Sequence, residues 1–160
     1  MELRAYQSAD CAATAALFYH TVHAVAARDY TPLQLDAWAP KSRDLDAWNR
    51  SLLAHFALVA VQNGVIVGFG DMDEAAGYLD RLYVHKDCQR QGIATALANA
   101  LEARAPGDIL VTHASRTARP FFEKRGYRVV RAQQVERGGV QLQNFVMEKR
   151  RPPAECPGRR

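Results

Sequence analysis

The stretch YLDRLYVHKDCQRQGIATALANALEA, residues 78–103, decides how this chain folds. Its first seven residues have the pattern of a strand, and a short polar loop follows them. From Gly92 the sequence becomes rich in alanine, the strongest helix former. The large apolar residues of this helix share one stripe: Ile93, Leu97 and Leu101. A strand that leads directly into a helix is typical of a crossover, so we expect a parallel strand pair here.

The polar loop before this helix is suited to bind an anion. The free N–H groups of a helix start, with the helix dipole behind them, favour negative charge. Gly92 has no side chain to keep a phosphate away from the backbone. Alone, the pattern Gln89-x-x-Gly92-x-Ala94 also suits a plain connecting turn. The sequence has neither a P-loop motif nor a G-x-G-x-x-G after a strand, which argues against an NTPase or a dinucleotide fold.

The rest of the chain supplies the elements around this crossover. Helices are predicted before the quoted stretch, and Asn63-Gly64 is a strong hairpin signal between two strands. A strand at 109–115, a short helix ending at Gly126 and a final hairpin around Gly138-Gly139 follow. The element order predicts one α/β (α+β) domain, with helices and a mixed sheet that is antiparallel except at one crossover.

Composition separates a domain from a tail. The chain has 160 residues, enough for one domain with a sizeable core, and a net charge of +4. Residues 150–160 hold four arginines and one glutamate, hence three of the four net positive charges. We therefore predict a domain at 1–149, followed by a basic, proline-containing tail that is disordered. A nearly neutral domain argues against nucleic-acid binding.

The cysteines and the lengths of the apolar runs indicate the cellular compartment of the protein. Cys11, Cys88 and Cys156 form no C-x-x-C pair, which argues against a disulfide framework or a thiolate zinc site and favours a reducing compartment. No apolar run approaches the roughly 20 residues that a membrane span needs. The cytoplasm is therefore the expected location, with no membrane partner.

Two motifs together resemble one family. Leu82-Tyr83-Val84 followed by Gln89-Arg90-Gln91-Gly92-Ile93-Ala94 resembles motif A of the GNAT N-acetyltransferase superfamily, [QR]-x-x-G-x-[GA] after a strand. The later segment HASRTARPFFEKRGY resembles that family's strand and helix ending in F-x-E-K-x-G-[FY]. The resemblance covers about residues 56–149 and is vaguer over the N-terminal helices.

The resemblance implies acetyl-CoA as co-substrate and a sheet splayed between the fourth and fifth strands. Pantetheine would lie in that gap and pair with the backbone around Tyr83, at Leu82 and Val84, as an added strand does. Ser115 and Phe122 would line the far side. The diphosphate would meet backbone N–H groups of Gln89, Arg90, Gln91, Gly92, Ile93 and Ala94, with Thr95 close by.

The chemistry of acetyl transfer needs a base and a donor to the carbonyl oxygen. Strand alternation predicts that Tyr78, Asp80, Leu82 and Val84 share one face. The resemblance implies that Asp80 points to the acceptor site, as general base or as the group that binds the substrate cation. A plain ion pair of Asp80 with a neighbouring arginine is the alternative. The resemblance also implies a backbone N–H donor near Tyr83 or Val84.

The position of the family's general acid, a tyrosine, is occupied here by Phe122. Tyr127, Tyr83, Ser115 or water are the candidates to replace it. A thiolate leaving group needs less help than an alkoxide because the pKa of a thiol is near 8.5. Cys88 could suggest an acyl-enzyme route, but it lies at the diphosphate end of the predicted site.

Aromatic and histidine side chains are candidates for the acceptor pocket. His20, Trp38, Tyr78 and His113 are predicted to bind substrate, although such residues at helical spacing more often belong to a core. His20 and His23 share a helix face, but no third ligand is evident, so we expect no metal.

These observations predict an acetyl-CoA-dependent N-acetyltransferase that acts on a primary amine of a small molecule or a protein by direct attack on the thioester. A non-catalytic module that binds or senses acyl-CoA is the alternative, prompted by Phe122. A third reading is an interaction protein that works through its basic tail. The acceptor stays open, and a homodimer is compatible with exposed sheet edges.

Overall fold

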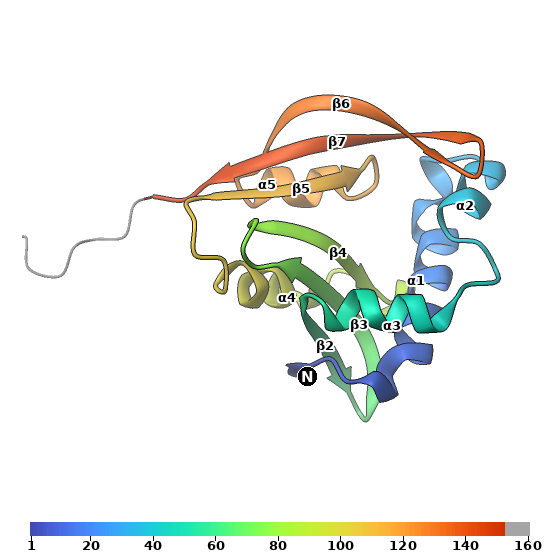
Figure 1. The fold of residues 1–160 in the computed structure, drawn as a ribbon, viewed down its shortest axis with the longest axis horizontal. Coiled ribbons are helices and arrows are strands. Elements are labelled where there is room, and N and C mark those ends of the chain that lie inside the picture. Colours follow the sequence, from blue (N-terminus) through green and yellow to red (C-terminus); the bar gives the residue numbers. More distant parts are fainter. Residues whose placement is uncertain (153–160) are drawn as a thin grey trace, which may run out of the picture.

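The computed structural model describes residues 1–152, which form a seven-stranded sheet in the order β1-β2-β3-β4-β5-β7-β6 (Figure 1). All neighbours are antiparallel except β4 and β5, as predicted. The strands are β1 (Glu2–Ala5), β2 (Phe56–Gln62), β3 (Val65–Asp73), β4 (Tyr78–Val84), β5 (Ile109–Ser115), β6 (Arg128–Arg137) and β7 (Val140–Arg150). The α-helices are α1 (Cys11–Val25), α2 (Pro32–Trp38), α3 (Leu45–Leu53), α4 (Ile93–Glu102) and α5 (Arg119–Lys124).

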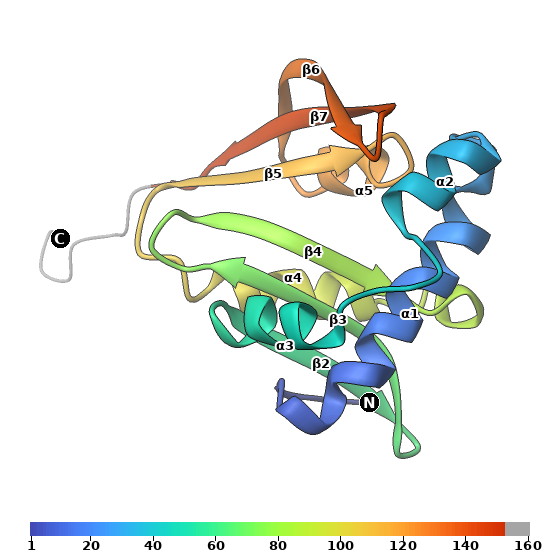
Figure 2. The same cartoon turned by 45° about the vertical axis from the view of Figure 1, so that its right-hand side comes forward.

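The pairing between β4 and β5 is very short. Only Tyr78 with Val111 and Leu79 with Thr112 are paired, at the start of β4. The Thr112 hydroxyl strengthens this point by donating to the Leu79 carbonyl over 2.9 Å. Beyond it the two strands diverge, and the ribbon divides into a β1–β4 part and a β5–β7 part (Figure 2). The splayed sheet that the resemblance implied is therefore present.

Helices cover both faces of the sheet and create two cores. One core lies under α4 and α5, and the other lies under α1, α2 and α3. Helix α4 approaches β3 closely at Gly68 and Gly70. A Cβ atom at Gly70 would lie 2.9 Å from both the Leu101 Cδ1 atom and the Arg81 carbonyl oxygen, so only glycine fits without movement.

A second junction joins the two parts of the sheet. The segment after α1 and helix α2 reach across to β7 and to the loop after β5 (Figure 1). The Tyr30 hydroxyl donates to the Gln143 carbonyl over 2.6 Å and accepts from the Arg116 N–H over 3.0 Å. Gln34 donates to the Gln141 carbonyl over 3.0 Å. The gap between β4 and β5 is thus fixed at both of its ends.

The boundary that we predicted for the tail is too early. Arg150 is the last residue of β7 and pairs with Ile109. The Arg151 N–H donates to the Asp108 carbonyl over 2.7 Å, and its guanidinium donates to the carbonyl of Glu102. We assigned Arg150 and Arg151 to the tail from composition, and composition carries no information on strand pairing. Residues 153–160, with Cys156 and the expected disorder, lie outside the described part. No helix within residues 1–152 is long and apolar enough to cross a membrane.

Candidate active site

Two cavities meet in the gap between β4 and β5. The larger cavity, of about 340 Å³, and the smaller one, of about 180 Å³, share six lining residues. These shared residues come from α2, β4, β5 and the segment that follows β5 up to α5: Trp38, Leu82, Tyr83, Ser115, Ala118 and Phe122. A ligand that enters through one cavity can therefore meet a ligand held in the other.

The smaller cavity leads to the start of α4. Val84, Gln89 and Ala94 belong to its wall. Gly92 has a φ of 81°, and no side chain caps the helix. The first helical bond runs from the Ala96 N–H to the Gly92 carbonyl, so the N–H groups of the first helical turn before Ala96 lack intrahelical partners. The helix start thus presents the free donors that the sequence predicted for an anion.

The residues of the loop have different local roles. The Gln89 side chain donates to the Val84 carbonyl over 2.6 Å and so ties the loop to β4. Arg90 adopts the left-handed conformation with φ 61°, which costs energy for a residue with a side chain. Arg90 and Gln91 are exposed. Ile93 is a core residue, so only its backbone can meet an anion, whereas the Thr95 side chain is exposed.

The gap-side edge of β4 carries peptide groups without a strand partner. The His85 N–H donates to the Val67 carbonyl of β3 over 2.8 Å. Because hydrogen bonding alternates along an antiparallel strand, Tyr83 also points its N–H toward β3, and Leu82 and Val84 point theirs into the gap. Of the two predicted backbone donors, Val84 is therefore available and Tyr83 is not.

A β-bulge changes the side-chain pattern that we predicted for β4. Asp71 pairs with Arg81 and Met72 pairs with Leu79, so Asp80 is the extra residue. Leu82 packs against the core under α4, in which Leu79 is buried, and alternation is broken between them. The prediction that Asp80 shares one face with Leu82 and Val84 is therefore wrong, because the period of two does not survive a bulge. Asp80 instead lines the larger cavity.

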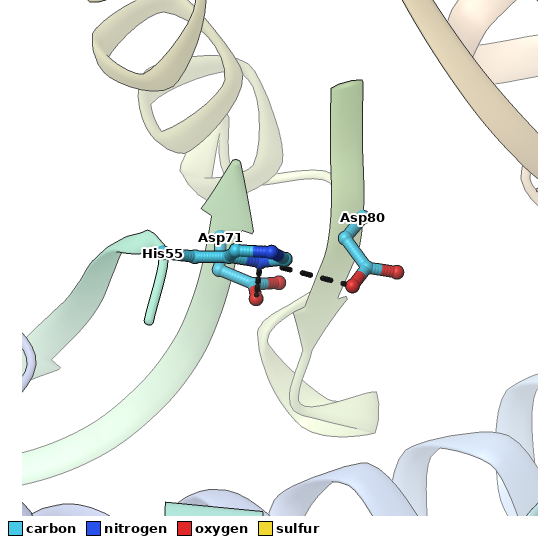
Figure 3. A group of neighbouring side chains, drawn as sticks. All are labelled: His55, Asp71 and Asp80. Carbon is cyan, nitrogen blue, oxygen red and sulfur yellow. Dashed lines mark hydrogen bonds and ion pairs between the residues drawn. The ribbon is translucent and has the colours of Figure 1, made fainter. Parts of the chain in front are cut away.

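A buried cluster of charges lies behind Asp80 (Figure 3). Asp71, whose side chain has no exposed surface, accepts from Arg81 over 2.9 and 2.5 Å and lies 2.8 Å from His55 Nδ1. His55 Nδ1 is also 3.8 Å from an oxygen of Asp80. Ligand atoms of the three residues drawn in Figure 3 lie within 4.8 Å of one another. A metal ion would have to displace the guanidinium that holds both Asp71 oxygens.

The environment of Asp80 changes its acidity. Its side chain keeps 34% of its surface exposed, yet burial in the cavity wall and the negative charge of Asp71 raise its pKa. Arg81, His55 and His113 act in the opposite direction. Burial and the charge of Asp80 raise the pKa of Tyr78 to about 12. A carboxylate with a raised pKa in a cavity is suited to accept a proton from an amine.

The other predicted residues divide into two groups. Trp38, Tyr78 and His113 line the larger cavity, and the rings of Tyr78 and His113 are 5.1 Å apart. His20 is exposed on α1 and lines neither cavity, so its assignment to the acceptor pocket stays a prediction that these cavities do not support. Helical spacing predicted the helix but not which face would meet the cavity.

The candidates for the general acid lie in different places relative to the cavities. Tyr127 lies outside both cavities, and its hydroxyl is 3.1 Å from an oxygen of Glu102, the last residue of α4. Its catalytic role therefore stays a prediction that the cavities do not support. Tyr83 and Ser115 lie where the cavities meet, but the Ser115 oxygen already accepts from the Ala118 N–H over 3.0 Å. Burial raises the pKa of Tyr83 above its ordinary range. Cys88 lines neither cavity.

Sequence reasoning missed several polar residues of the site. Arg43 and Asn144 line the larger cavity, and His55 and Asp71 support Asp80. No local pattern marks Arg43 in the loop before α3 or Asn144 in β7, because only tertiary contacts bring them to the cavity. The strand pattern alone could not pair Asp71 with Arg81, since that required knowledge of the register.

Comparisons with known proteins agree with this arrangement. Residues 26–149 match a family model described as an acetyltransferase (GNAT) domain. The chain is 35% identical to the uncharacterised N-acetyltransferase YafP of Escherichia coli K12, over 92% of this chain and 94% of that protein.

Solved structures give the same result. A GCN5-related N-acetyltransferase from Rhodopseudomonas palustris, whose crystal structure is also named aminotransferase, class-II, superposes with a TM-score of 0.90. It is 36% identical, over 93% of this chain and 94% of that one. The putative acetyltransferase yncA of Salmonella typhimurium, solved with its cofactor acetyl-CoA, shares the fold with a TM-score of 0.68. It is 23% identical, over 98% and 97% of the two chains. This chain belongs to the GNAT superfamily of N-acetyltransferases.

Proposed function

We propose that this protein transfers the acetyl group of acetyl-CoA to a primary amine of a small molecule or protein, by direct attack of the amine on the thioester. The observation that carries this proposal is the meeting of two cavities at the unpaired edge of β4, with Asp80 in the wall of the larger one. Acetyl-CoA supplies an acetyl group activated as a thioester, and the chain supplies backbone donors and a base.

The smaller cavity and the start of α4 suit the cofactor. The free N–H groups of Ile93, Ala94 and Thr95 are donors for a diphosphate at the positive end of the helix dipole. The gap-facing N–H groups of Leu82 and Val84 and the Leu82 carbonyl match the amides of pantetheine, which would add to the edge of β4. These residues fit the group that neighbours of the fold bind.

The larger cavity suits the acceptor. Asp80 would bind the ammonium and take its proton, directly or through a water molecule, before the nitrogen attacks the carbonyl carbon. A gap-facing N–H of Leu82 or Val84 would donate to the carbonyl oxygen as negative charge develops on it. The carbon–sulfur bond then breaks as the carbon–nitrogen bond is completed. Because the pKa of the Tyr83 hydroxyl is raised, this group can donate a hydrogen bond to the departing thiolate more readily than a proton.

The alternative, a non-catalytic module that senses acyl-CoA, rests on Phe122 at the usual position of the acid. Phe122 is buried at the junction of the cavities and packs against Tyr127, with ring centroids 5.1 Å apart. A thiolate leaving group does not require that acid, so Phe122 is compatible with transfer. Binding of acetyl-CoA without transfer to any member of a broad amine panel would favour the sensor.

Replacement of Gly92 tests the position of the cofactor. We expect Gly92→Asp to weaken the binding of acetyl-CoA by at least about tenfold in a calorimetric titration, because a carboxylate would repel the diphosphate. Gly64→Asp in the β2–β3 hairpin is the matched control. Both glycines have a positive φ and open space around an added Cβ atom, so they bear similar strain. Equal affinity in the two variants would place the diphosphate elsewhere.

Replacement of Asp80 tests the base. Asp80→Asn should lower kcat/KM for amine acetylation by at least about 100-fold, because the amide cannot accept the proton, and should leave acetyl-CoA affinity unchanged. Steady-state release of the CoA thiol measures the first quantity and calorimetry the second. Asp46→Asn, in the exposed first turn of α3, is the control and should keep full activity. Unchanged turnover in Asp80→Asn would remove Asp80 from the chemistry.

The charges behind Asp80 predict a pH effect. Asp80 must be ionised to act as a base, so kcat/KM falls as the pH drops through its raised pKa. Because the positive charge of His55 lowers that pKa, His55→Gln should move this acid limb to higher pH. His20→Gln on the exposed face of α1 should leave the profile in place. Deprotonation of the free amine also contributes to the pH profile of kcat/KM, but this contribution is the same for all variants. A shift to lower pH, or the same shift in both variants, would contradict the assignment.

A further inference from the structure

The wall of the larger cavity contains an arginine without an anionic partner. The Arg43 guanidinium lies 4.9 Å from the ring centroid of Phe18 and 4.7 Å from that of Trp48. Within residues 1–152, no carboxylate forms an ion pair with it. Burial and the nearby charge of Arg81 lower the pKa of Arg43, which means that the charged form of Arg43 is destabilised at this position.

The neighbouring Arg81 makes the contrast plain. It also lies over the Trp48 ring, at 4.9 Å, but Asp71 neutralises it through two hydrogen bonds. Two arginines beside one tryptophan therefore differ: one belongs to the internal cluster behind Asp80, and the other faces the cavity without a counter-charge. The rings of Phe18 and Trp48 lie beside the Arg43 guanidinium. Within residues 1–152 its N–H groups form no side-chain hydrogen bond, so they are available to bind a planar anion.

The wall contains more arginines than carboxylates. Arg137, at the end of β6, lines the cavity, and among the described residues its guanidinium donates only to the adjacent Glu136 carbonyl. The wall therefore contains three arginines and one carboxylate, Asp80, and with Arg81 paired to Asp71 the other two arginines still outnumber Asp80. The side-chain oxygen of Asn144 in this wall is buried and has no hydrogen-bond partner among the described residues. An amide in that position can turn to meet either a donor or an acceptor of a ligand.

We propose that the acceptor of this enzyme is an amine that also carries an acidic group, a carboxylate or a phosphonate, and that Arg43 binds this group. The inference rests on the proposed function, because it takes the larger cavity as the acceptor site. Asp80 holds the ammonium end and Arg43 holds the anionic end of one zwitterionic molecule. A cavity of about 340 Å³ limits this molecule to a small one.

This arrangement gives selectivity through the cost of an unpaired charge. A carboxylate that binds Arg43 replaces the water that the partly buried guanidinium has lost. A neutral amine of the same size leaves the half-buried Arg43 charge without a partner and gains nothing from it. A polyamine or a basic peptide would add positive charge to a wall that already has an excess of it.

Matched pairs of amines test the proposal. Glycine, 4-aminobutanoate and phenylalanine are each compared with their neutral amides, and 2-aminoethylphosphonate with its diethyl ester. Binding to the CoA-saturated protein is measured by calorimetry, and transfer from acetyl-CoA by release of thiol. We expect at least one acid to bind and react at least about tenfold better than its neutral partner. The carboxylate and phosphonate arms identify which acidic group is preferred. Neutral partners that equal or exceed every acid would overturn the proposal without any variant.

Variants assign the preference to Arg43. Arg43→Gln should abolish the acid preference, and Arg50→Gln, exposed on α3, should keep it. Arg43→Lys retains the charge but loses the planar stacking, so it should retain part of the preference if the charge binds the acid. The assignment would be contradicted if Arg43→Lys lost the acid preference as fully as Arg43→Gln. It would also be contradicted if the preference survived in Arg43→Gln. Selective binding of acids without transfer would leave this site intact and refute the proposed acetyltransferase activity instead.

Discussion

The pairing of β4 with β5 at only two residue pairs is the constraint on which the rest of the structure depends. A longer ladder would pair the N–H groups of Leu82 and Val84 inside the protein and would close the gap. Because the strands part after Leu79, these groups are left at an open edge, and both cavities form beside them. An open edge in the middle of a sheet leaves backbone donors that a strand-like ligand or water can pair with, so this edge is suited to receive such a ligand.

The gap is held open by contacts far from it in sequence. The Tyr30 hydroxyl joins the segment after α1 to both β7 and the loop after β5, and α2 adds a bond to β7. These contacts set the width of the gap before any ligand arrives, which lowers the entropy that binding must overcome. The Asp71–Arg81 pair does the same for the acceptor side, because it fixes β4 at the bulge that turns Asp80 into the larger cavity.

Local patterns predicted the fold better than they predicted the site. The element order and the loop at 89–94 could be read from sequence because hairpin signals, helix starts and the family motif are contiguous. The sequence predicted Asp80 as a site residue, and the side chain lines the larger cavity, but the face predicted for it was wrong because a bulge breaks the alternation on which that prediction depended. The sequence predicted both His20 and Trp38 as substrate-binding residues. Only the packing shows that His20 is exposed and that Trp38 lines the cavity. No sequence pattern pointed to Arg43, because the absence of an anionic partner depends on the tertiary structure.

Amide hydrogen exchange of β4, resolved residue by residue with NMR and measured with and without saturating CoA, tests the central claim most directly. In the free protein, the amides of Leu82 and Val84 should exchange fast, and those of Arg81 and Tyr83, which face β3, should be protected. CoA should then slow exchange at Leu82 and Val84 strongly relative to their neighbours. Protection of Leu82 and Val84 before CoA is added, or exchange that CoA leaves unchanged, would contradict the view that the open edge of β4 is the cofactor site.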